Sequence, residues 1–142
     1  MLRKNKYLEE LGIPQDVYGG NFVRERKVHR FMQRRKYGID YRDIFNMDVS
    51  FGEWLYTHMR MYKENSVHDD TYCSVEFDGV KYTIEGAIDR IINASGEFLR
   101  CTYNLDIVPH PRDYSDEEEY QIEEEFINSA RLFLKILGYC WL

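Results

Sequence analysis

The C-terminal part of the chain carries a helix signal that is complete from start to end. Ser115 followed three residues later by Glu118 forms a capping box, in which each side chain satisfies a backbone N–H of the other residue. Acidic residues fill the first turn and basic residues lie near the end, an order that complements the helix dipole. Helical spacing assigns one side of this segment to the core: Ile122, Phe126, Ile127, Ala130, Phe133, Leu134 and Leu137.

Two more helices are predicted in the middle of the chain. Ser50 and Glu53 form another capping box, and Thr83 is placed to cap a second helix. Behind Ser50 the predicted core stripe is Phe51, Trp54, Leu55, His58, Met59 and Tyr62. Behind Thr83 it is Ile84, Ile88, Ile91, Ser95, Phe98 and Leu99. We expect these two helices and the C-terminal one to form the core, with Trp54 fully buried.

A β-hairpin is predicted near residues 73–82. Asp78 and Gly79 suit the positive backbone angles of a tight two-residue turn, and short β-prone runs flank them. Because two strands alone are marginally stable, the hairpin must pack on helices or pair with another chain.

The N-terminal residues 1–20 are predicted to be an arm with a short helix, whose apolar side holds Tyr7, Leu8 and Leu11 and which Gly12 ends. Residues 21–142 then form a single helical domain. We expect the arm to reach over a neighbouring molecule, which makes a homo-oligomer plausible. The predicted fold class is a mainly helical α+β domain, with four or five helices and one small hairpin.

Charge is distributed unevenly along the 142 residues. Residues 1–42 hold 11 Lys and Arg against 5 Asp and Glu, whereas the whole chain has a formal net charge of −6. Such asymmetry indicates two faces for different partners, or two parts of one molecule that meet each other.

The basic segment Arg24–Tyr37 is predicted to be a helix that Gly38 ends. Its candidate ligand-binding residues share one side of that helix: Arg26, Lys27, Arg30, Arg34 and, at the end, Tyr37. Guanidinium groups bind phosphate with paired hydrogen bonds, and a tyrosine ring can stack on a base. The opposite, apolar side holds Val28, Phe31 and Met32. Arg35 falls among these apolar positions, so we expect it to pair inside the fold with Asp40, Asp43 or Asp48.

Other interpretations of the charged segments stay open. The basic stripe can instead face solvent or the acidic helix Asp116–Glu125. The acidic run can be a nucleic-acid mimic that occupies the basic groove of a nucleic-acid-handling enzyme, or it can serve only to stabilise the start of a helix and to keep the protein in solution.

No catalytic, metal or cofactor motif is present. The chain lacks a phosphate loop, a GxSxG element and an HExxH element. The segment Val67–Asp70 is a weak metal candidate, and Cys73 and Cys101 are more typical of core filling than of nucleophiles. The three scattered cysteines fit a reducing compartment, and no apolar run is long enough to span a membrane. We therefore expect no enzyme, no cofactor, no metal and no membrane partner.

From Tyr37 onward the sequence resembles a widespread group of small phage- and prophage-encoded proteins of unknown function. The matching elements are Lys36-Tyr37-Gly38-Ile39, Asp40 to Asp43, Phe45-Asn46-Met47-Asp48, Trp54-Leu55, Glu117–Glu119 and Trp141-Leu142. Phe45 and Met47 stand where the group usually has Trp and Leu. The resemblance implies a phage origin and carries no known activity.

The resemblance and the basic stripe together predict a non-enzymatic anti-defence binder in the cytoplasm of a bacterial host. Its partner would be a phosphate-bearing, nucleotide-type immune signal, which it sequesters as a sponge. The alternatives are an inhibitor of a bacterial defence protein that acts through the acidic helix, and a phage structural or assembly protein.

Overall fold

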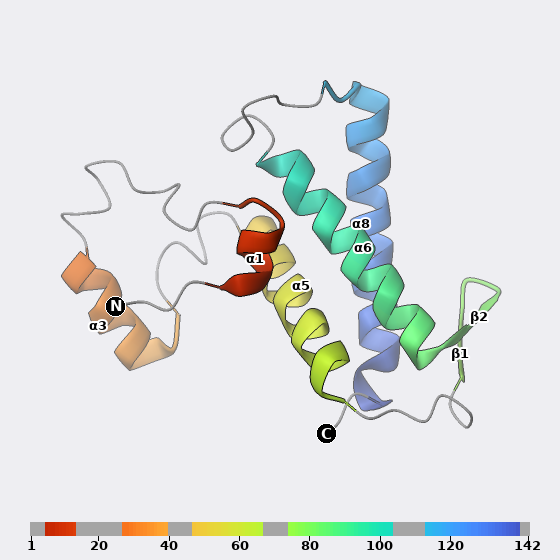
Figure 1. Ribbon diagram of the computed structural model, residues 1–142, viewed down its shortest axis with the longest axis horizontal. Helices are drawn as coiled ribbons and strands as arrows, with labels where there is room; N and C mark the ends of the chain where they lie inside the picture. Colours follow the sequence, from red (N-terminus) through yellow and green to blue (C-terminus); the bar gives the residue numbers. More distant parts are fainter. Residues whose placement is uncertain (1–4, 14–26, 40–46, 67–73, 104–112, 140–142) are drawn as a thin grey trace.

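The computed structural model describes residues 5–13, 27–39, 47–66, 74–103 and 113–139. This part of the chain is mainly helical with one antiparallel hairpin, which confirms the predicted fold class (Figure 1). The elements are α1 (Lys6–Glu10), α3 (Lys27–Tyr37), α5 (Met47–Asn65), β1 (Ser74–Phe77), β2 (Val80–Thr83), α6 (Ile84–Thr102), α8 (Asp116–Ile136) and the 3-10 turn η1 (Leu137–Tyr139).

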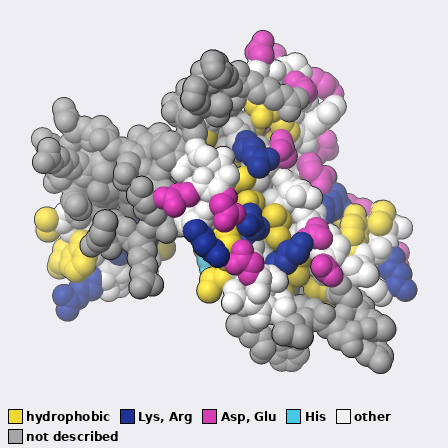
Figure 2. Space-filling model, in the orientation of Figure 1, with side chains coloured by type: hydrophobic (Ala, Val, Ile, Leu, Met, Phe, Trp, Pro, Cys, Tyr) yellow, Lys and Arg dark blue, Asp and Glu magenta, His cyan; other side chains and the backbone are white. Residues whose placement is uncertain are grey.

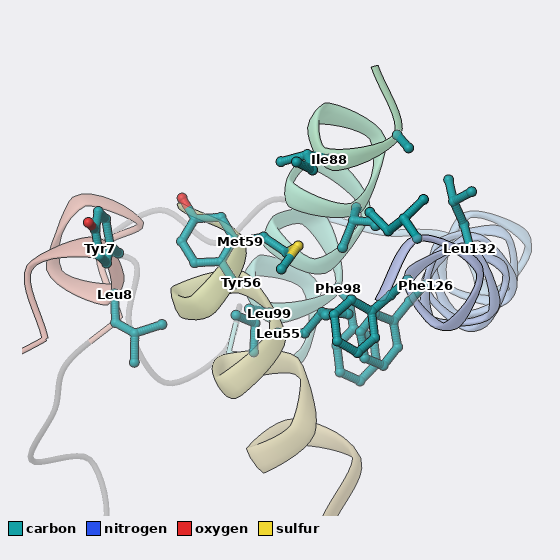
Figure 3. Packing of buried hydrophobic residues seen from close by; sticks show 14 of the residues in the cluster. Tyr7, Leu8, Leu55, Tyr56, Met59, Ile88, Phe98, Leu99, Phe126 and Leu132 are labelled. Carbon is teal, nitrogen blue, oxygen red and sulfur yellow. The ribbon is translucent and has the colours of Figure 1, made fainter. Parts of the chain in front are cut away.

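The helix α6 is the centre of the core, and both α5 and α8 pack against it. In Figure 1, α5 and α8 both run downward, whereas α6 runs upward. All six residues predicted for the core side of α6 are buried. The ring of Phe98 stacks on that of Phe126 from α8 with centroids 4.1 Å apart, as Figure 3 shows.

The close approach of α5 to α6 depends on a glycine. A Cβ atom at Gly96 would lie 3.2 Å from the Tyr56 ring of α5, closer than ordinary van der Waals contact. Gly96 is therefore tolerated inside α6, despite its low helix propensity, because it makes room for Tyr56.

The hairpin forms where it was predicted, with Ser74 opposite Thr83 and Phe77 opposite Val80. Its two turn residues have positive φ angles of 48° at Asp78 and 76° at Gly79, as a tight hairpin turn requires. Val75 and Phe77 of β1 are buried, and the hairpin contacts α6 and α8. The two strands are thus stabilised by helices, and Thr83 goes on to cap α6 by accepting a hydrogen bond from the Gly86 N–H.

The short helix α1 packs on its own chain. Tyr7, Leu8 and Ile13 are buried in the core, and α1 contacts α5. The chain turns at Gly12, which has a φ of +78°, and the Ile13 N–H then donates to the Leu8 carbonyl, which folds Ile13 back onto the helix. For residues 5–13 the predicted reach over a neighbouring molecule is therefore wrong, because their apolar side covers α5. The predicted boundary at residue 20 lies outside the described residues.

A polar cluster holds α1 against α5. The Glu64 carboxylate accepts hydrogen bonds from the Lys6 ammonium at 3.0 Å and from the Tyr7 hydroxyl at 2.8 Å. The hydrogen bond from Lys6, followed by that from Tyr7, holds the pKa of Glu64 below its usual value. Arg60 donates to Glu10 at 2.7 Å and so adds a second link between the same two helices.

The predicted start and facing of α5 are partly wrong. The helix begins at Met47, so Ser50 lies inside it and does not cap it. Leu55 and Met59 are buried as predicted, but Trp54 is 44% exposed and Phe51 is 38% exposed. The predicted stripe was wider than the surface that α6 can cover, and its aromatic edge faces outward.

The capping box of α8 is confirmed. The Glu118 N–H donates to the Ser115 hydroxyl at 3.2 Å, and the Ser115 N–H donates to the Glu118 carboxylate at 3.0 Å. The predicted core face is rotated, however. Buried positions on α8 are Phe126, Ser129, Leu132, Phe133 and Ile136, whereas Ile127, Leu134 and the following Leu137 are exposed.

Candidate ligand-binding surface on α3

All charged residues of the helix α3 are basic. Its 11 residues include Lys27, Arg30, Arg34, Arg35 and Lys36 and no acidic residue. Three of these cations lie in the last turn, where they complement the negative end of the helix dipole. The helix ends as predicted at Gly38, which has a φ of +79° and whose N–H donates to the Arg34 carbonyl oxygen at 2.9 Å.

The structure places the predicted site residues only in part. Lys27 and Arg30 lie on α3, but their side chains are outside the described part of the structure. Arg26 lies outside the described residues altogether. Arg34 and Tyr37 are both exposed, with Tyr37 at 65%. The ammonium of Lys36 lies 5.0 Å from the centre of the Tyr37 ring, a cation–π contact that sequence reasoning missed.

The apolar side of α3 is exposed as well. Val28 is 75% exposed, Phe31 63% and Met32 56%, so this side is not part of the core. Figure 2 shows yellow hydrophobic and dark-blue basic side chains next to each other on α3, at the left of the view. The helix therefore presents its apolar side outward, together with Arg34 and Tyr37, the described members of its cationic side.

The prediction for Arg35 is wrong. Its side chain is exposed rather than inside the fold, because the apolar side to which it belongs is not covered. Asp48, one of its predicted partners, is exposed in the first turn of α5. Asp40 and Asp43 lie outside the described residues.

The acidic helix α8 has its own ionic partner in the described core. Arg90 of α6 donates to both carboxylate oxygens of Glu125, at 2.7 and 3.0 Å, and these bonds raise the pKa of Arg90. In Figure 1, α1 and α5 lie between α3 and α8. The acidic first turns of α8 are exposed at Asp116, Glu117 and Glu119.

The described residues contain no group of three or more His, Cys, Asp or Glu side chains that could hold a metal ion. His68, the histidine of the predicted weak metal candidate, and Cys73 lie outside the described part. Cys101 is half-buried, and His58 stacks on Trp54 with ring centroids 4.1 Å apart. Within the described segments, no helix combines the length and the apolar character that crossing a membrane requires.

Comparisons with known protein families, curated proteins and solved structures find no match for this chain.

Proposed function

We propose that this protein is a non-enzymatic binding protein that holds a phosphate-bearing, nucleotide-type ligand on the cationic side of α3. The observation that supports it is the density of positive charge: five cations and no acid in 11 residues, on a helix whose described side chains are mostly exposed. In a bacterial host the protein would act as a sponge for an immune signal, an anti-defence role that follows from the resemblance to phage proteins.

The spacing of the arginines suits a phosphate group. Arg30 and Arg34 are four residues apart on α3, and side chains at this spacing start about 6 Å from each other on one side of a helix. Arg26, four residues before Arg30 in the sequence, lies outside the described residues. Two guanidinium groups can therefore donate to the oxygens of one phosphate, while a third reaches the next. The exposed ring of Tyr37 follows on the same side and offers a stacking face for a base.

Overall charge favours a small ligand over a long nucleic acid. The chain has a formal net charge of −6, although α3 alone contributes five positive charges. Residues 43–142 hold 20 Asp and Glu against 8 Lys and Arg, and this excess of negative charge would repel a long polyanion that extends beyond α3. A nucleotide with one to three phosphates needs only the length of α3.

A second candidate function rests on α8. Its first turns expose acidic side chains, and seven acidic residues against two basic ones make the helix strongly negative. Such a surface fits the basic groove of a nucleic-acid-handling defence enzyme, as an inhibitor that mimics the nucleic acid would. Capture of one such enzyme, abolished by replacing Glu117 and Glu119 with Gln, would support this function.

The test of the ligand proposal is calorimetry at low salt with cyclic oligonucleotides, adenosine-diphosphate-ribose-type signals and short oligonucleotides. A charge-assisted hydrogen bond contributes about 1.5–3 kcal/mol, so the double variant Arg26→Ala/Arg30→Ala should bind at least about a hundredfold more weakly. The matched control is Arg100→Ala/Arg131→Ala, which removes the same charge from two exposed arginines on α6 and α8.

The control variant should bind like the unmodified protein. Absence of binding by the unmodified protein at micromolar concentration would overturn the proposal, and equal weakening by both double variants would show that only net charge matters.

A further inference from the structure

The helix α5 carries an apolar stripe that the core does not use. Met47, Phe51, Trp54, His58 and Met61 follow each other at intervals of four, three, four and three residues, which places them on one side of the helix. All five are exposed, with Met47 at 66% and Met61 at 58%. The His58 Nδ1 donates to the Trp54 carbonyl at 2.7 Å, which holds the imidazole flat against the indole.

A second apolar ridge lies on α8 and on the first residue of η1, next to the first ridge. Ile127, Leu134 and Leu137 are exposed at 53%, 68% and 50%, although the spacing of an amphipathic helix would normally bury them. The Trp54 ring meets the edge of Phe133 at 5.8 Å, and the Phe51 ring lies 6.1 Å from that of Phe126. The two ridges thus form one surface, here called the α5–α8 face.

The arrangement of α5, α6 and α8 indicates what kind of element could cover this face. The helices α5, α6 and α8 alternate in direction, and α6 packs against both others (Figure 1). Three alternating helices fill three of the four places in an up-and-down four-helix bundle. The fourth place is the one that contacts α5 and α8 together, and its occupant would run antiparallel to both. One amphipathic helix that contacts both α5 and α8 would therefore cover the α5–α8 face.

The helix α3 has the pattern that this place requires. Its exposed apolar residues Val28, Phe31 and Met32 lie in its first half, and two exposed cations that are not among the candidate ligand-binding residues, Arg35 and Lys36, lie in its last turn. On α8 the order is reversed, because exposed Glu119 and Glu123 come first and the apolar ridge follows. An antiparallel α3 would set apolar against apolar and cation against acid. Helical spacing assigns Arg30 and Arg34 to its other side.

We infer that α3 of a second copy of this chain occupies the α5–α8 face, giving a dimer in which the two copies exchange α3. The structure places a chain's own α3 beyond α1 and α5, away from α8, as exchange requires (Figure 1). A two-fold dimer would repeat the same contact twice and cover both exposed apolar surfaces of each copy. The inference does not depend on the proposed ligand, since the cationic side of α3 would stay outward.

The test is sedimentation of the full chain without ligand, followed by mixing of variants. The unmodified protein should be a dimer at micromolar concentration. Phe31→Glu places a charge on the apolar side of α3, and Leu134→Glu places one on the face, so each should weaken the dimer by about a hundredfold. Val80→Glu is the matched control, because Val80 is 50% exposed on the hairpin, and it should leave the dimer intact.

Mixing identifies the two surfaces that meet. The Phe31→Glu chain keeps an intact face and the Leu134→Glu chain keeps an intact α3, so the mixture should form a mixed dimer that neither variant forms alone. A monomeric unmodified protein would overturn the inference, and so would a dimer that Leu134→Glu abolishes but Phe31→Glu leaves intact, since that pattern indicates direct pairing of two faces. Loss of ligand binding in Arg26→Ala/Arg30→Ala with an intact dimer would support the proposed function separately.

Discussion

Two leucines on α8, two positions apart, provide a sharp test of how this helix faces the core. Leu132 is fully buried on a helix that packs against α6, whereas Leu134 is 68% exposed. Both are inside the same regular helix, so truncation to alanine changes helix propensity equally at the two positions. Any difference between the two variants therefore reports burial.

The expected magnitudes are far apart. Truncating a fully buried leucine removes its transfer free energy and leaves a cavity, so Leu132→Ala should lower the free energy of unfolding by about 3 kcal/mol. For a chain of this size each kcal/mol corresponds to roughly 3–5 °C, so the Tm should fall by about 10 °C. Leu134→Ala should change the free energy of unfolding by less than about 0.5 kcal/mol.

The measurement is urea and thermal unfolding followed by circular dichroism. Both truncations are made on the Phe31→Glu background, which the inferred dimer predicts to be monomeric, because association with a second copy would otherwise add to the stability of the folded state. A larger loss of stability from Leu134→Ala than from Leu132→Ala would show that α8 is rotated relative to the arrangement described above. It would also remove the apolar ridge from which the α5–α8 face is built.

Three further outcomes are expected. Gly79→Ala should destabilise the hairpin by about 1–2 kcal/mol, because a side chain there must adopt a positive φ, and Gly138→Ala, with open space and no such φ, should not; comparison of the two melting temperatures decides this. The folded state stabilises the ionised form of Glu64, so its contribution to the free energy of unfolding is present above the usual pKa near 4.5 and is lost as pH falls through the lowered pKa of the folded state. Glu64→Gln should therefore flatten the acid side of a curve of stability against pH. An unchanged slope would contradict the role of the hydrogen bond from Lys6. Ser115→Ala should cost about 1 kcal/mol in urea unfolding, and no loss would mean that the capping box is not formed in solution.

Apart from the start of α5, whose predicted capping residue Ser50 lies inside the helix, the positions where helices and strands begin and end were the most predictable features. Thr83 caps α6, Ser115 caps α8, and Asp78-Gly79 turns the hairpin, all as expected from the sequence. These signals are local, since each depends on hydrogen bonds or backbone angles within three or four residues. No distant part of the chain is needed to read them.

The facing of the helices was less predictable, for a physical reason. The apolar residues of α8 are numerous enough to cover two adjacent sides, and spacing alone cannot say which side meets α6. Small Ser129 was not expected in the core, yet it is fully buried and its hydroxyl donates to the Phe126 carbonyl at 2.8 Å. That internal bond removes the cost of burying a polar group and leaves room for close helix contact.

The sequence predicted which charged residues make up the candidate site, but it did not predict which sides of α3 are exposed. The cations of α3 stand out in the sequence, but their setting depends on what covers the apolar side of the same helix, which is a long-range matter. Arg35 illustrates the point: its spacing correctly groups it with Val28 and Phe31, and the error lay in assuming that this side is buried within its own chain.

Because α3 is short, ligand binding on its cationic side is expected to depend on what covers its apolar side. Isolated helices shorter than about 12–15 residues are marginal in water, and α3 has 11 residues with exposed side chains on its apolar side. Its stability therefore depends on a surface that covers Val28, Phe31 and Met32, and a ligand on the arginines alone would not cover them. Docking of that apolar side on the α5–α8 face of a second copy would order the helix first, and a helix already ordered would bind phosphate at a smaller entropic cost. In the inferred dimer, the concentrated charge of this segment would form the outer side of a helix whose inner side holds two copies together.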